Sequence, residues 1–248
     1  MRGAAIIGAM LVAPALLAAA TSLVWMPDDP TALTPTPPPE PPLAAHWLGT
    51  DMPGRDMAAL AMLGARLSVA VALAAAALGL GLGVPLGLAR RPVRLLALLL
   101  PVLALILGIG TLGRSGLHAA LAIAFLDASV AAWVTRRAAR PIWRRDHIRA
   151  AELAGKSRGR IALEHVLPHI ARRLAVLAPL LFGFGILAEA ALSRAGLGVQ
   201  PPSQSWGLML AQDGAQGGAF VPGLAILLTG LGAALLGLGL RDRPEAGP

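Results

Sequence analysis

The sequence predicts a single-domain, all-α integral membrane protein with six transmembrane helices. Hydrophobic residues make up 56% of its 248 residues and charged residues only 14%, and the mean hydropathy is +0.69. Soluble domains carry a more even balance. The apolar residues also gather in six blocks, most of which approach the ~20 residues that a helix needs to cross ~30 Å of hydrocarbon. The blocks cover residues 3–25, 67–89, 95–110, 118–135, 174–192 and 221–240, and 95–110 is the shortest.

The distribution of positive charge predicts the orientation of these helices. Of the 21 Lys and Arg residues, eleven lie in residues 136–173, three in 90–94, two near the C-terminus and one at Arg2. If all six blocks cross the membrane, these segments lie on one side, and loops rich in Lys and Arg face the cytoplasm. We therefore expect both termini in the cytoplasm. The net charge of +8 then reflects topology and does not indicate a nucleic-acid partner.

The first block allows two interpretations. Arg2, the apolar stretch and the alanines at positions 18–20 fit a secretory signal with a small-residue cleavage site. The block is long for the apolar part of such a signal, which favours a retained first helix over residues 1–26. Cleavage would leave the remaining topology unchanged, so the charge distribution does not decide between the two.

A Pro- and Thr-rich stretch follows, and residues 27–58 are expected to form an external linker that ends in a polar motif. The motif carries Asp51, Arg55 and Asp56 among glycines, immediately before a helix. We expect these three residues to cap that helix and to pair with one another, rather than to contact a substrate.

The second block contains a stripe of small residues. Gly79, Gly83 and Gly87 recur every four residues and therefore lie on one face of a helix. Small residues on one face let another helix approach closely, which is how helices associate in lipid. Pro85 lies within the same stripe and predicts a kink.

Residues 149–168 form a basic, Ala-rich segment between two membrane-length apolar blocks. Its composition favours a helix, whereas Gly155 is expected to end the first helical run and Pro168 to cap the far end of the segment. Its charges would each cost several kcal/mol in hydrocarbon. We therefore expect the loop over residues 136–173 to be cytoplasmic, to have structure of its own, and to dock a partner.

Residues 186–209 form a further motif at the outer end of the fifth block. Glu189 is expected to act as a structural anchor that hydrogen-bonds the turn after it, and Trp206 suits a membrane-interface position. Two glycines and two prolines predict that turn: Gly196, Gly198, Pro201 and Pro202. Asp127 lies inside the fourth block, where an ionisable group is costly and has a partner or faces water. A functional role and a packing role for Asp127 both stay open.

Three motifs together resemble the permease subunits of peptide- and nickel-type bacterial ABC importers, and specifically the second of the two permease types. The 149–168 segment is similar to that family's coupling loop, with Arg149 where the family has Glu and His165 where many members have Ile. The external motif and the 186–209 motif match in the same order along the chain. The residues that carry the resemblance in the coupling loop are Arg149, Ala150, Ala151, Glu152, Gly155, His165, Leu167 and Pro168. Those on the outer side are Gly49, Thr50, Asp51, Gly54, Arg55, Asp56, Glu189, Gly196, Gly198, Gln200, Pro201, Pro202, Trp206 and Gly207.

The resemblance implies a type I ABC importer permease fold in the inner (plasma) membrane, with residues 59–243 as the permease domain and 244–248 as a cytoplasmic tail. It implies a heterodimer with a second permease, in contact with lipid, served by two ATPase subunits and an external substrate-binding protein. It also implies that Mg-ATP binds the ATPase subunits and that this chain holds no cofactor and is no enzyme. Peptides, nickel complexes and opines all fit the pattern as substrates.

Several motifs offer other functions. Lys156 lies between Gly155 and Ser157 as in a phosphate-binding loop, but no strand precedes it and the first Gly of such a loop is replaced by Ala150. His165 and His169 have helical spacing but lack a third metal ligand. An intramembrane hydrolase using Asp127 or Glu189 is a weaker alternative, as is a membrane scaffold without transport activity.

Overall fold

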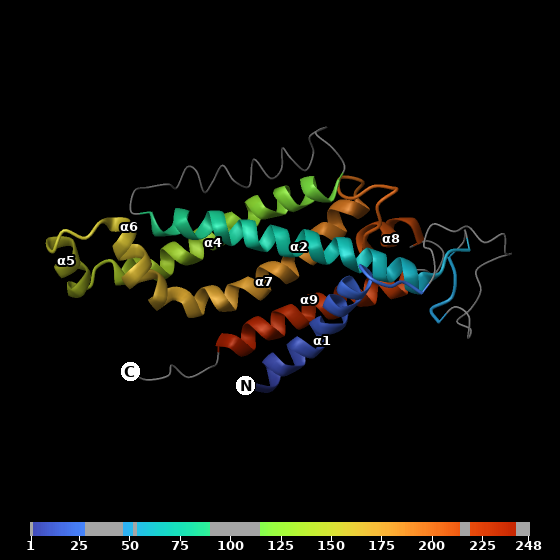
Figure 1. Cartoon of the computed structure of the whole chain (residues 1–248), viewed down its shortest axis with the longest axis horizontal. Helices are drawn as coiled ribbons and strands as arrows, with labels where there is room; N and C mark the ends of the chain where they lie inside the picture. The colour runs from blue at the N-terminus through green and yellow to red at the C-terminus, as the bar shows by residue number, and fades with distance from the viewer. Residues whose placement is uncertain (1, 28–46, 52–53, 90–114, 214–218, 242–248) are drawn as a thin grey trace.

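The chain folds into a bundle of long helices, shown in Figure 1. The computed structural model describes residues 2–27, 47–51, 54–89, 115–213 and 219–241. Five helices in this part of the chain are long and apolar enough to cross a membrane. The described elements are α1 (Arg2–Thr21), α2 (Met57–Leu88), α4 (Gly116–Ile142), α5 (Asp146–Leu153), α6 (Arg158–Ile161), the π-helical turn η1 (Ala162–Val166), α7 (Leu167–Arg194), α8 (Trp206–Asp213) and α9 (Phe220–Arg241). The predicted span 95–110 lies outside the described residues.

The glycine stripe of α2 packs directly on α4, as predicted. A Cβ atom built on Gly83 would lie 2.5 Å from the carbonyl oxygen of Ala128, and one on Gly87 would lie 2.5 Å from Cβ of Thr135. A Cβ on Gly79 would collide with Cβ of Asp127. The contacts advance in the same direction along both helices, so α2 and α4 run parallel. The end of α2 and the start of α4 therefore lie at opposite ends of the bundle (Figure 1).

Three further helix pairs, α2 with α7, α7 with α9 and α1 with α9, run antiparallel and also meet at small residues. Gly185 of α7 packs on Ala72 of α2, and Gly183 of α7 packs on Ala233 of α9. A Cβ on Gly8 of α1 would lie 2.5 Å from the backbone nitrogen of Leu236 in α9. The start of α1, the start of α7 and the end of α9 thus lie toward one end of the bundle, which also carries α5 and α6 (Figure 1).

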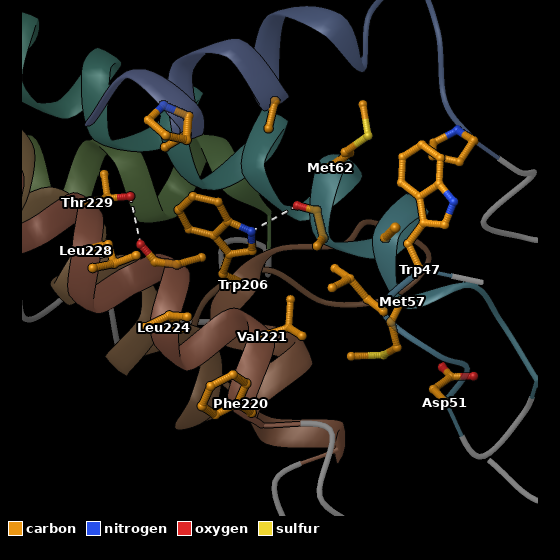
Figure 2. A pocket seen from close by; sticks show the side chains of 18 of the residues that line it. Trp47, Asp51, Met57, Met62, Trp206, Phe220, Val221, Leu224, Leu228 and Thr229 are labelled. Atoms are coloured by element: carbon orange, nitrogen blue, oxygen red, sulfur yellow. Dashed lines mark hydrogen bonds between the residues drawn. The ribbon is translucent and has the colours of Figure 1, made fainter. Parts of the chain in front are cut away.

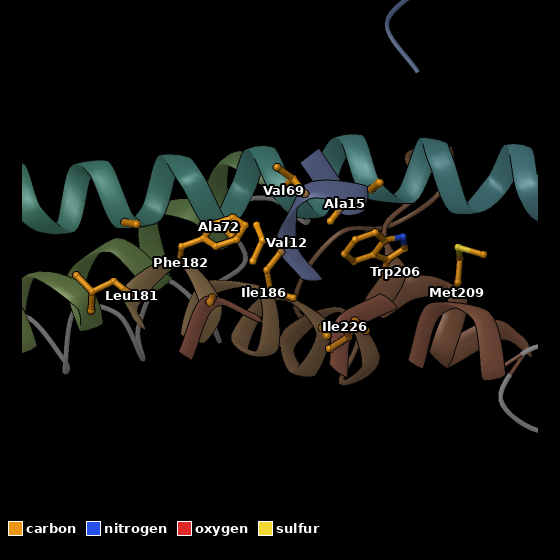
Figure 3. Close-up of a cluster of buried hydrophobic side chains, with 14 of the residues drawn as sticks. Val12, Ala15, Val69, Ala72, Leu181, Phe182, Ile186, Trp206, Met209 and Ile226 are labelled. Carbon is orange, nitrogen blue, oxygen red and sulfur yellow. The ribbon is translucent and has the colours of Figure 1, made fainter. Parts of the chain in front are cut away.

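The main core lies between α1, α2, α7, α8 and α9 (Figure 3). Ile186 and Met209 are fully buried in it, and Phe182 and Trp206 add large side chains. Long side chains on the outer faces remain exposed, as a lipid-facing surface requires. They include Leu73, Leu82, Leu187, Leu227 and Leu231.

One predicted helix boundary is confirmed and another is wrong. α2 begins at Met57, directly after the polar motif and ten residues before the apolar block, and Asp56 caps it as expected by accepting a hydrogen bond from the backbone nitrogen of Ala59 at 2.9 Å. Pro168 does not end a helix: the chain is helical without interruption from Arg158 to Arg194. Pro lacks an N–H and crowds the carbonyl four residues earlier. The wider π-helical turn directly before it makes a bond from Leu167 to Ala162, five residues back, and accommodates the proline.

Candidate functional site

A buried polar network joins three elements at the outer end of α7. Ser68 Oγ of α2 donates a hydrogen bond to Glu189 Oε2 at 2.8 Å, and Ser193 Oγ donates to Glu189 Oε1 at 2.6 Å. The backbone nitrogen of Trp206, at the start of α8, donates to Ser68 Oγ at 3.1 Å, and that of Val199 donates to Ser193 Oγ at 3.0 Å. All these side chains are buried. The network therefore fastens the loop after α7 and the start of α8 to α2.

Glu189 is thus the structural anchor that the sequence predicts. Both of its carboxylate oxygens bond serine hydroxyls, and the turn is reached through Ser193. Both oxygens of this carboxylate are thus engaged within the protein, which argues against Glu189 as the reacting group of an intramembrane hydrolase. Sequence reasoning did not single out Ser68 or Ser193 as partners of Glu189, because their proximity depends on how α2 and α7 pack.

The turn after α7 follows the prediction from its glycines. Gly196 has φ +75°, a conformation that glycine adopts without strain, and it ends α7. Gly198 packs against Ser193, where a Cβ would lie 2.5 Å from Oγ. Gly207 allows α8 to touch α7, since a Cβ there would lie 2.5 Å from Cα of Ala190. Gln200 donates from Nε2 to the carbonyl oxygen of Val199 at 3.0 Å. Pro201 and Pro202 lie in the same exposed turn.

Trp206 is buried inside the bundle and does not face lipid, whereas the sequence predicts only that it suits a membrane-interface position. It is only 3% exposed, and its indole Nε1 donates to the carbonyl oxygen of Ala61 in α2 at 2.9 Å. A buried tryptophan needs such an acceptor for its N–H. Its apolar ring packs into the core, so both the polar and the apolar parts of the side chain have partners inside the protein.

The external motif over residues 49–56 forms a closed loop before α2, and the predicted pairing is confirmed. Asp51 accepts hydrogen bonds from the backbone nitrogen and from Nε of Arg55, both at 2.7 Å. Gly49 and Gly54 have φ of 78° and 83°. The backbone nitrogen of Met57 donates to the carbonyl oxygen of Gly49 at 3.0 Å, which closes the loop. Thr50 and Asp56 form an isolated antiparallel bridge within it.

A cavity of about 880 Å³ lies beside this loop, between α1, α2, α8 and α9. Its wall is mostly apolar and includes Met57, Trp206 and Phe220, with Trp47 and Asp51 on the side of the external loop (Figure 2). Sequence reasoning missed this cavity because its residues come from distant parts of the chain. It can hold an apolar group at the end of the bundle opposite α5.

The 149–168 segment lies at the opposite end. α5 projects there beyond the spans (Figure 1), and Gly155 ends it with φ +77°, as predicted. Ile148 and Ala151 of α5 face inward and pack with Ile161 and Val166. Ala151 is therefore on the inner face, and not part of the exposed contact surface that its family motif implies. Among the other motif residues, Glu152, His165 and Leu167 are partly buried, and Pro168 is exposed in the first turn of α7.

The outer face of α5 carries Asp146, Arg149, Ala150 and Leu153, which recur at the spacing of one helix face. Leu153 is 89% exposed, an unusual position for a large apolar side chain outside the spans. Sequence reasoning did not select Leu153. The helical spacing of Ile148 and Ala151 could have indicated the inward face of α5, and Leu153 lies on the opposite face.

Lys156 has a structural role in the described chain. Its Nζ donates to Glu164 Oε2 at 2.9 Å, and Ser157 caps α6. The helix α5, and no strand, precedes Gly155, so the geometry of a phosphate-binding loop is not present here. Glu164 also lies 3.5 Å from Nε of Arg160.

The structure adds His147 to the predicted histidine pair. The rings of His147 and His169 stack with centroids 6.0 Å apart, and His165 lies edge-on to His147 at 6.3 Å. His169 Nδ1 lies 2.6 Å from the carbonyl oxygen of His165. Within the described residues, no group of three His, Cys, Asp or Glu side chains has an arrangement that holds a metal ion.

Asp127 is fully buried on α4, against Gly79. Within the described part of the chain, neither carboxyl oxygen has a hydrogen-bond partner. The missing Cβ of Gly79 provides the space for this side chain. A packing role and a functional role therefore both stay open.

Comparisons with known proteins agree with this architecture. Residues 68–242 match the family model of the binding-protein-dependent transport system inner membrane component. The chain is 35% identical over 216 residues to the di/tripeptide transport system permease protein DppC of Pseudomonas aeruginosa, covering 80% of this chain and 71% of that protein. It is 33% identical over 218 residues to the dipeptide transport system permease protein DppC of Alkalihalophilus pseudofirmus, covering 81% and 72%. The chain belongs to the binding-protein-dependent transport system inner membrane component family, has its type I ABC permease fold, and is a permease subunit of an ABC importer.

Proposed function

We propose that this chain forms the translocation path of a peptide importer together with a second permease. Two ATPase subunits and an external binding protein complete the complex. The names of the relatives, which are di/tripeptide and dipeptide transport permeases, support the substrate class. The matching 149–168, external and 186–209 motifs support the assembly. To test the substrate class, the melting temperature of the binding protein that serves this importer is measured with and without dipeptides. A rise with dipeptides would show that it binds them.

The observation that carries this proposal is the outer face of α5. Leu153 is 89% exposed, and Ala150 beside it leaves room for close approach. An apolar side chain of this exposure is stabilised when a partner covers it. We assign this face to the docking groove of an ATPase subunit, with Arg149 facing an acidic part of that groove.

α5 is also joined firmly to the spans. Ile148 and Ala151 pack with Ile161, Val166 and Ile170, and the last three belong to the continuous helical run that includes α7. The far end of α7 carries Glu189 and its network. Movement of α5 during ATP hydrolysis is thereby transmitted to the outer end, as alternating access requires.

The orientation follows from the same arrangement. The end that carries α5 also carries most of the Lys and Arg residues, so we place it in the cytoplasm with both chain termini. Nucleotide then binds the ATPase subunits, and this chain itself binds neither nucleotide nor metal. The packing of α1 along α9 supports a retained first helix.

The test uses two substitutions of one residue in the complex reconstituted with its partner subunits and binding protein. Leu153→Ser removes the apolar contact, and full burial of a leucine contributes about 1.5–3 kcal/mol. Peptide transport and peptide-stimulated ATPase activity should both fall about tenfold or more. Leu153→Met keeps an apolar side chain of similar volume and should retain both activities to within about twofold.

The amount of chain in the membrane is measured in parallel and should not change, because no span is altered. If the Leu153→Ser complex kept wild-type transport and ATPase activity, α5 would not be the element that docks the ATPase subunit. A wild-type complex that hydrolyses ATP without moving peptide would favour the scaffold alternative.

A further inference from the structure

A second cavity, of about 370 Å³, lies where α2 and α4 leave the bundle on the side of α5. The end of α2 forms one wall, and three arginines line the other: Arg136, Arg140 and Arg144. Arg136 and Arg140 are four residues apart and share one face of α4, and Arg144 follows in the turn after the helix. Trp143, which is half-buried, borders the same space. We call it the arginine cavity.

The charge in the arginine cavity is uncompensated within the described part of the chain. Arg136 is half-buried and donates from Nη1 to the carbonyl oxygen of Ala89 at 3.3 Å. Arg140 and Arg144 are exposed, and the ion pairs of the described residues involve other arginines and Lys156. Several guanidinium groups that converge without a carboxylate form a site for an anion with several oxygens, such as a phosphate group.

The position of this cavity relative to the membrane follows from Trp133. Its ring is 62% exposed on the outside of α4, and the guanidinium carbon of Arg137 lies 5.5 Å from the ring centroid. Exposed tryptophans mark the boundary between hydrocarbon and headgroups. Arg140 lies seven residues further along α4, about 10 Å at ~1.5 Å per residue, and Arg144 follows in the turn after the helix. This places the arginine cavity on the headgroup side of the boundary that Trp133 marks.

We propose that the arginine cavity binds the phosphate headgroup of an anionic phospholipid. The occupant is a lipid and not a soluble anion, because the cavity opens at headgroup level beside an apolar helix face. Basic pockets between transmembrane helices on the cytoplasmic side have the chemistry for such headgroups. The assignment to the cytoplasmic leaflet rests on the proposed orientation, whereas lipid binding itself does not.

The experiment compares two double variants that remove the same charge from the same end of the bundle. Arg140→Gln with Arg144→Gln changes the arginine cavity and leaves the Arg136 bond to α2 intact. Arg137→Gln with Arg173→Gln changes arginines that do not line it. The full-length chain is purified in mild detergent and incubated with phosphatidylglycerol or phosphatidylcholine. Native mass spectrometry then counts bound lipids, and thermal unfolding verifies the fold of each variant.

The wild-type chain is expected to retain phosphatidylglycerol in preference to phosphatidylcholine. The cavity pair should weaken that retention about tenfold or more, and the control pair less than about threefold. Arg140→Lys with Arg144→Lys keeps the charge and should retain the lipid to within about threefold, which separates loss of charge from loss of fold.

Three results would overturn the proposal. Equal losses in the two glutamine pairs would mean general attraction to a basic surface, and no loss in either would mean that the cavity holds no headgroup. Displacement of phosphatidylglycerol by inorganic phosphate at equal phosphorus concentration would assign the site to a soluble anion. Transport is measured separately, so a failure of lipid binding leaves the permease function standing.

Discussion

Ser68 and Glu189 lie 121 residues apart in sequence and 2.8 Å apart in the bundle, with Ser68 Oγ donating to Glu189 Oε2. The same hydroxyl accepts from the backbone nitrogen of Trp206. One small side chain therefore connects α2, α7 and α8, all inside the protein. The loop that leads from α7 to α8 is held at both of its ends by this network, since Ser193 lies in the last turn of α7 before it and Trp206 follows it.

Glu189→Ala should destabilise the chain. The change leaves the hydroxyl hydrogens of Ser68 and Ser193 without their acceptor in a buried site, and each such loss costs roughly 1–3 kcal/mol. Thermal unfolding of the purified chain should shift downward, and transport should fall with it. Asp146→Ala is the control, because the side chain of Asp146 is fully exposed and its contact with Arg149 is long at 3.9 Å. Equal stability of the two variants would contradict the anchoring role.

Gly83→Ala should separate α2 from α4. Its Cβ would lie 2.5 Å from the carbonyl oxygen of Ala128 and 2.6 Å from Cβ of Ala131, and overpacking of this kind costs about 1–3 kcal/mol. Gly81→Ala, on the open face of the same helix, has nothing within 4 Å and should be neutral or stabilising by up to about 1 kcal/mol. Thermal unfolding of both variants measures the difference. A Gly83→Ala chain as stable as the Gly81→Ala chain would mean that this stripe is not a tight interface.

Single cysteines should report the orientation, because the natural chain has none. Ser157→Cys and Ser203→Cys introduce thiols at exposed positions at opposite ends of the bundle. In intact cells whose outer membrane is permeabilised, an impermeant maleimide should label position 203 and not position 157. The reverse pattern would overturn the cytoplasmic placement of α5. A reporter fused after Gly113 should in addition face outside, and an inside signal there would exclude a crossing by residues 95–110.

The purified chain is expected to bind no ATP, and Lys156→Ala should therefore not change ATP binding. The contact between Lys156 and Glu164 is a surface ion pair, which contributes about 0–1 kcal/mol, so the variant should also unfold close to the wild-type temperature. Equilibrium dialysis with labelled ATP provides the measurement. Saturable binding that Lys156→Ala abolishes would make this segment a nucleotide site after all.

Much of the fold could be predicted from hydrophobic blocks and glycine spacing. Each of the five membrane-length helices overlaps one block, and the blocks 3–25 and 221–240 match their helices to within about four residues at each end. The stripe from Gly79 to Gly87 identifies the face of α2 that meets α4. Counting apolar residues missed the first turns of α2, where capping by Asp56 extends the helix beyond its apolar part. Pro168 was misassigned because its penalty depends on the turn before it, which here is π-helical.

The candidate site was predictable where one segment supplies it and not where several meet. Gly155, Gly196 and the Asp51–Arg55 pair act within their own loops, and local patterns found them. The partners of Glu189, the burial of Trp206 and the two cavities depend on contacts between helices far apart in sequence. No local pattern encodes those contacts.

The uninterrupted helix from Arg158 to Arg194 has a mechanical consequence. At ~1.5 Å per residue, its 37 residues form a rod of about 55 Å, longer than the hydrocarbon is thick. Measured along the helix, Glu189 lies about 20 Å on one side of the midpoint, and Ile161, which packs against α5, lies about 22 Å on the other. A tilt of the rod about its middle moves these two ends in opposite directions. Motion of the α5 end toward the bundle axis would therefore move the loop anchored by Glu189 away from that axis.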